Sequence, residues 1–101
     1  MYRLIKNRGI FEGIVIGDGN NKTKYLITPH FVQRMYQRCV MADDVAECLV
    51  RGEWRKGSKK GYVEVEYKLM KVVIEKKNRK NNRLVTVYYK KKITDKAKKL
   101  A

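Results

Sequence analysis

Hydrophobic and polar positions change their spacing twice along the chain, and the three regions predict different elements. Residues 10–27 contain two apolar, β-branched runs separated by Gly17-Asp18-Gly19-Asn20-Asn21, a composition typical of a turn. Between about residues 29 and 51 the apolar residues recur at helical spacing, and after Gly52 they alternate with polar ones. The pattern predicts a β-hairpin within Tyr2 to Ile27, then helices, then strands.

Two helix starts are recognisable. Thr28 can cap the free amides of a first helix, and Pro29 suits its first position, so this helix is predicted from about Pro29 to Cys39. The segment "MADDVAECLVRG" predicts a second helix, with Asp43 or Ala42 near its cap and Gly52 as its stop.

The alternating segments are "EWRKG", "YVEVEYK", "MKVVIEKK" and "RLVTVYYKKK", with Asn81-Asn82 as a hairpin turn between the last two. We therefore expect an α+β fold in which two helices pack on one face of a four-stranded antiparallel sheet, with an extra N-terminal β-hairpin. The 101 residues suit a single domain, with the hairpin at 1–27, the core at 28–90 and a basic tail at 93–101 that is either a short helix or a frayed end.

Several classes of protein are disfavoured by composition. No apolar run approaches the roughly 18 residues that a membrane span needs, and the start "MYRLIKNRGIFEG" lacks the pattern of a secretory signal. We expect a cytoplasmic protein without a membrane partner. Cys39 and Cys48 are too few for a disulfide framework and lack the spacing of a zinc site, so buried reduced thiols are favoured over a redox or catalytic use. We expect neither metal nor cofactor.

The net charge of +15 points to a polyanionic partner. The excess is uneven, because residues 1–50 carry 7 basic and 5 acidic groups, whereas residues 51–101 carry 18 and 5. RNA fits such a surface through its phosphates, and the predicted nucleic-acid-binding residues are Lys71, Arg83, Lys90, Lys91 and Lys92. The alternative is that a lysine-rich surface only keeps the protein soluble, although +15 exceeds what solubility needs in so short a chain.

The first helix carries the only histidine. Phe31, Met35 and Cys39 fall on its apolar side, while His30, Arg34 and Arg38 form an i, i+4, i+8 row on the polar side, with Arg38 nearest the buried edge. Three such groups in one row repel one another, and an anion would relieve that repulsion. The alternative is a solvated helix face with an ordinary surface histidine.

Ribonuclease chemistry requires a proton carrier, cations for the phosphorane and hydroxyl groups for orientation, and it needs no metal when the RNA 2′-OH is the nucleophile. The helix row supplies the first two. In "LVTVYY", alternation places Thr86 and Tyr88 on one face of the last strand, where they are candidate catalytic hydroxyls. The alternative is that these residues are simply good strand formers.

Three segments together, "TPHFVQRMYQR", "ADDVAECLVRGEW" and "YKLMKVVIEKKNRKNNRLVTVYY", resemble a small bacterial and phage family of domains of unknown function with a His-x3-Arg-Met-x2-Arg helix. The resemblance covers about residues 26–90. That family is similar to the ribonuclease superfamily of the RelE and BrnT toxins and the barnase-like and colicin-like tRNases, in which two helices pack on a four-stranded antiparallel sheet. The resemblance implies active-site roles for His30, Arg34, Arg38 and Thr86, with Tyr88 as a further candidate.

One segment departs from the family pattern. Members usually have Gly-Ile-Ser after the second arginine, whereas this chain has Cys39-Val40-Met41. This difference predicts a shifted turn between the helices, with Asp43 as the cap of the second helix.

The leading hypothesis is a metal-independent endoribonuclease of the toxin type, with an acidic antitoxin or immunity protein as partner. The alternative is a non-catalytic nucleic-acid-binding or partner-binding module of phage or plasmid origin. In that case Trp54, Tyr62 and Tyr67 would be available to stack bases, although Trp54 suits a core position better. A degenerate family member acting as an inhibitor or structural protein is the third possibility.

Overall fold

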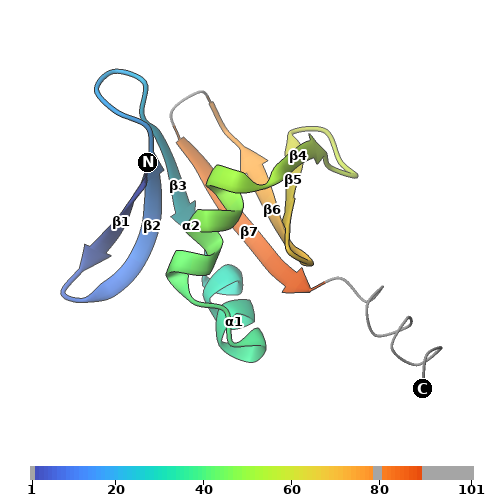
Figure 1. Ribbon diagram of the computed structural model, residues 1–101, viewed down its shortest axis with the longest axis horizontal. Coiled ribbons are helices and arrows are strands. Elements are labelled where there is room, and N and C mark those ends of the chain that lie inside the picture. The colour runs from blue at the N-terminus through green and yellow to red at the C-terminus, as the bar shows by residue number, and fades with distance from the viewer. Residues whose placement is uncertain (1, 79–80, 90–101) are drawn as a thin grey trace.

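The computed structural model describes residues 2–78 and 81–89, and it contains one seven-stranded sheet with two helices (Figure 1). Three strands precede the helices: β1 (Tyr2–Asn7), β2 (Ile10–Ile16) and β3 (Thr23–Ile27). The helices α1 (Pro29–Arg38) and α2 (Ala42–Arg51) follow, and then β4 (Glu53–Lys56), β5 (Tyr62–Tyr67), β6 (Met70–Lys76) and β7 (Asn81–Tyr89). The predicted order of strands, two helices and further strands is confirmed, but three strands precede the helices where a single hairpin was predicted.

The predicted four-stranded antiparallel sheet is wrong. The strand order is β1-β2-β3-β7-β6-β5-β4, and β3 pairs with β7 in parallel, in the register Lys24 with Asn81 through Ile27 with Leu84. The sheet is therefore mixed, and the N-terminal strands extend it at one edge. This pairing joins segments more than 50 residues apart, and such contacts leave no local pattern in the sequence.

The predicted turn at Asn81-Asn82 is also wrong. Both residues belong to β7, where they pair with Lys24 and Tyr25. Asn78 contacts the start of β7: its side-chain oxygen accepts a hydrogen bond from the backbone N–H of Asn81 at 2.8 Å, and its own N–H donates to the carbonyl of Asn81 at 3.2 Å. Asparagine pairs are typical of turns, but here the sheet incorporates them.

Both helices lie on the same side of the sheet (Figure 1), and the hydrophobic core fills the space between the helices and the sheet. Phe31 of α1 and four residues of α2 are buried against alternate residues of the strands, among them Ile14, Tyr25, Val65, Val72 and Val87. Because successive strand residues point to opposite faces, the other alternate residues of these strands face away from the helices. We call that side the open face.

Two helix ends refine the sequence predictions. The first helix ends at Arg38, and Cys39 adopts the left-handed conformation with φ 53° and ψ 42°. The second begins at Ala42, so its third residue is Asp44, whose carboxylate accepts a hydrogen bond from the N–H of Met41 at 3.1 Å. Asp44, and not Asp43 or Ala42, is therefore the residue whose side chain accepts a backbone hydrogen bond at the start of α2.

Neither helix in the described part of the chain is long and apolar enough to cross a membrane. The predicted basic tail at 93–101 lies outside the described residues.

Candidate functional site

Thr28 fixes where α1 begins and ties it to the central strand. Its hydroxyl oxygen accepts a hydrogen bond from the N–H of Phe31 at 3.2 Å, as predicted for a helix cap. The same hydroxyl donates to the carbonyl of Leu84 in β7 at 3.0 Å. One side chain therefore caps the helix and holds it beside β7, and this sets the position of His30 in the first turn.

His30 and Arg34 are in direct contact. The Nε–H of Arg34 donates to Nε2 of His30 at 3.4 Å, and Nη1 of Arg34 donates to Oε1 of Gln37 at 2.9 Å. A nitrogen that accepts a hydrogen bond carries no proton, so this geometry corresponds to a neutral imidazole protonated at Nδ1. The Nε2 lone pair of an exposed histidine thus lies beside a guanidinium.

The third member of the row, Arg38, is partly buried, as the sequence predicted. Neither Arg34 nor Arg38 forms an ion pair with a carboxylate of residues 2–78 or 81–89. Their charges are therefore not neutralised by the described protein, which is the arrangement expected of a site for an anion.

Thr86 and Tyr88 lie on the open face and not beside this row. Val87 between them is fully buried in the core on the helix side, and Thr86 and Tyr88 pair with Val73 and Lys71 of β6. Alternation along the strand then directs both hydroxyls away from the helices. The structure brings His30 and Arg34 together but places the two β7 hydroxyls on the other side of the sheet.

Lys71 lies on the open face within a group of ionic contacts. Its ammonium lies 3.0 Å from Glu64 and 3.3 Å from Glu66, and 5.8 Å from the ring centre of Tyr88. The hydrogen bond to Glu64 raises the pKa of Lys71, against the opposing effect of burial. This lysine, predicted to bind nucleic acid, is largely neutralised by two carboxylates.

The remaining predicted phosphate-binding residues differ in position. Arg83 is exposed and lies on the open face of β7, opposite Leu26 and Glu75 in the sheet register. The register of β6 with β7 shifts between Val73 and Ile74, so Arg83 shares this face with Thr86 and Tyr88. Lys90, Lys91 and Lys92 lie outside the described residues.

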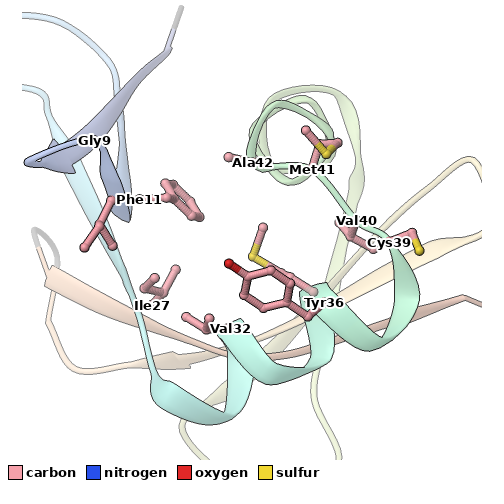
Figure 2. Close-up of a pocket in the computed structure, with 11 residues that line it drawn as sticks. Gly9, Phe11, Ile27, Val32, Tyr36, Cys39, Val40, Met41 and Ala42 are labelled. Carbon is pink, nitrogen blue, oxygen red and sulfur yellow. The ribbon is translucent and has the colours of Figure 1, made fainter.

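An apolar cleft of about 640 Å³ lies on the opposite side of α1 from the row (Figure 2). It is bounded by the turn between β1 and β2, by α1, and by the connection between the helices, as the labels Gly9, Val32 and Met41 show. With 100° per residue, Val32 lies about 160° around the helix from Arg34. The only ionisable side chains that line the cleft are Tyr36 and Cys39. The cleft therefore lacks the cations that phosphate chemistry requires.

Sequence reasoning missed a second group of basic residues. Arg3, Lys22 and Lys24 line a polar hollow of about 400 Å³ with Asn20 and Asn81. They are scattered in the sequence and are brought together by strand pairing and by the loop between β2 and β3.

No group of three His, Cys, Asp or Glu side chains in the described ranges is arranged to hold a metal ion.

The family described as "Domain of unknown function (DUF4258)" matches residues 27–89, from the end of β3 through the last residue of β7. No curated protein and no solved structure matches the chain.

Proposed function

We propose that this chain, which belongs to the family described as "Domain of unknown function (DUF4258)", is a metal-independent endoribonuclease of the toxin type. The contact between Arg34 and His30 carries this proposal. It provides an exposed proton acceptor beside a cation that no described carboxylate neutralises, on a protein of net charge +15. RNA cleavage with the 2′-OH as nucleophile requires both a proton acceptor and a cation that stabilises the phosphorane.

In the proposed reaction the guanidinium of Arg34 moves from Nε2 of His30 to the bound phosphate, which frees the Nε2 lone pair. The 2′-OH of a ribose attacks the adjacent phosphorus, and Nε2 of His30 takes the hydroxyl proton. Arg34 and Arg38 stabilise the additional negative charge of the phosphorane. The bond from phosphorus to the 5′-oxygen then breaks, and that oxygen takes a proton from solvent. The products are a 2′,3′-cyclic phosphate and a 5′-hydroxyl, and His30 returns its proton to solvent.

The kinship with RelE-like and BrnT-like ribonucleases remains part of this proposal and is supported by the helix pattern His30-x3-Arg34-Met35-x2-Arg38. The proposal includes RNA as substrate, activity in the cytoplasm, and an acidic antitoxin or immunity protein as partner. The charge of +15 supports such a partner, because it attracts acidic proteins as it attracts RNA.

Incubation of the purified chain with a mixed RNA pool in EDTA tests the activity. We expect cleavage by the wild type and a loss of about 10²- to 10⁴-fold on His30→Ala. Arg34→Ala should also lower the rate, whereas Gln33→Ala, an exposed polar residue of the same helix, should leave it unchanged. Absence of cleavage, or equal cleavage by wild type and His30→Ala, would contradict the proposal.

A second candidate function is RNA binding without cleavage. It is supported by the placement of Thr86 and Tyr88 on the open face, which leaves the α1 row without hydroxyl partners from β7. Under this function RNA binding is unaffected by His30→Ala, falls steeply with salt, and is accompanied by no cleavage products.

A further inference from the structure

A row of four residues crosses the N-terminal half of the sheet on its open face. The register pairs Arg3 of β1 with Val15 of β2, Val15 with Lys24 of β3, and Lys24 with Asn81 of β7. Ile14 and Tyr25 are buried against the helices, so their neighbours Val15 and Lys24 face the other way. Strand pairing thus brings residues from positions 3, 24 and 81 together.

The loop between β2 and β3 completes this row as a hollow. Asn20 and Lys22 from the loop line the same cavity of about 400 Å³ as Arg3, Lys24 and Asn81. Val15 in the middle is buried, with 7 % of its surface exposed. Three cations and two carboxamides therefore surround one concave position, and none of the residues lining it is acidic.

Arg3, Lys22 and Lys24 form no ion pair within the part of the chain that the structure describes. Lys71, further along the same face, is held by Glu64 and Glu66. Like charges that converge without a carboxylate repel one another, and a bound anion removes that repulsion. The hollow therefore differs from the surroundings of Lys71 in having positive charge and polar donors available.

We propose that this hollow binds a backbone phosphate of single-stranded nucleic acid, at a site separate from the α1 row. The guanidinium of Arg3 and the ammonium groups of Lys22 and Lys24 contact the phosphate oxygens, and the amide groups of Asn20 and Asn81 donate further hydrogen bonds. Arg83 lies two residues along β7 from Asn81 on the same face, and Tyr88 lies beyond it. The single-stranded nucleic acid then follows β7 from the hollow towards the ring of Tyr88.

Most of this site lies outside the family match, because Arg3, Asn20, Lys22 and Lys24 precede residue 27. The N-terminal strands therefore add nucleic-acid binding to the matched domain. The inference does not depend on cleavage, since phosphate binding here involves no residue of α1.

The test measures binding of a fluorescein-labelled, 2′-O-methylated 12-nucleotide RNA, which lacks the 2′-OH needed for cleavage, by anisotropy across a salt series. The probe variant is Lys22→Gln/Lys24→Gln. The matched control is Lys59→Gln/Lys60→Gln, which removes the same charge from the exposed connection between β4 and β5, near the opposite edge of the sheet. A third variant, Asn20→Asp, adds a negative charge to the hollow without removing a cation.

We expect the probe variant to bind at least tenfold more weakly than the control, with the slope of log affinity against log salt reduced by about 1.4 for two lost contacts to a single strand. Asn20→Asp should also weaken binding, and His30→Ala should not. Equal losses in the probe and control variants would overturn the proposal, because they would show that the overall positive charge of the protein, and not the hollow, attracts the RNA. Wild-type affinity in both hollow variants, or a response to phosphatidylserine vesicles but not to RNA, would also overturn it.

Discussion

Arg34 donates from Nε to Nε2 of His30 across 3.4 Å, one helical turn along α1. This contact specifies which nitrogen of the neutral imidazole carries the proton. The first prediction is that neutral His30 in the free protein is protonated mainly at Nδ1. In Arg34→Gln the more usual form, protonated at Nε2, should increase. Nitrogen-15 chemical shifts of the imidazole distinguish the two forms, and an unchanged ratio in Arg34→Gln would show that the contact does not set the tautomer.

Thr28 should contribute measurably to stability, because its hydroxyl both caps α1 and donates to the carbonyl of Leu84. Thr28→Ala loses both hydrogen bonds, and we expect the free energy of unfolding to fall by about 1 to 3 kcal/mol. Thr28→Ser keeps the hydroxyl and serves as the control, with a loss of less than about 1 kcal/mol. Urea unfolding measures both, and equal losses in the two variants would mean that the methyl group, and not the hydroxyl, matters.

Cys39 should be replaceable by glycine with a gain in stability. It ends α1 at φ 53°, and Val40 donates its N–H to the carbonyl of Met35 at 2.9 Å, a geometry that glycine adopts without steric cost. Relief of the left-handed strain exceeds the entropy of a more flexible unfolded chain, so we expect Cys39→Gly to be more stable than Cys39→Ala by about 0.5 to 1 kcal/mol. Thermal unfolding compares the two variants, and a lower midpoint for Cys39→Gly contradicts this account of the helix end.

Cys48 should make stability fall at alkaline pH. Burial, aided by the charge of Glu66, raises the pKa of this thiol from 9.0 to about 12. A raised pKa in the folded state leaves stability intact below about pH 9 and reduces it as the pH rises from about 9 to 12. The free energy of unfolding should therefore drop between pH 8 and pH 11 by on the order of 2 kcal/mol more in the wild type than in Cys48→Ala. The exposed Cys39 is the control, and Cys39→Ala should keep the wild-type drop.

Local features of this fold were predictable because each depends on neighbouring residues. The turn at Gly17 to Asn21, the cap at Thr28 and the stop at Gly52 all follow from side-chain chemistry within a few positions. The parallel pairing of β3 with β7 does not, since it depends on which strands meet after the whole chain has folded. The incorporation of Asn81 and Asn82 into β7 follows from that pairing, and so was missed with it.

The same distinction applies to the candidate sites. The spacing of His30 and Arg34 on one helix predicted their proximity, and alternation correctly placed Thr86 and Tyr88 on a shared face. Which face that is depends on where the helices pack, and this could not be derived from the strand alone. Arg3 and Lys24 meet across β2 by register, so the basic hollow arises in the half of the chain that carries little net charge.

The central claim, that the chain cleaves RNA through its 2′-OH with His30 as proton acceptor, is tested most directly by the ends of the products. An oligonucleotide that the wild type cleaves in EDTA should yield a 2′,3′-cyclic phosphate and a 5′-hydroxyl by mass spectrometry. A single 2′-deoxy substitution at the cleaved nucleotide should abolish that cut, and His30→Ala should slow it by about 10²- to 10⁴-fold. Cleavage of the deoxy-substituted strand at the same position, or a 3′-hydroxyl product, would contradict the claim.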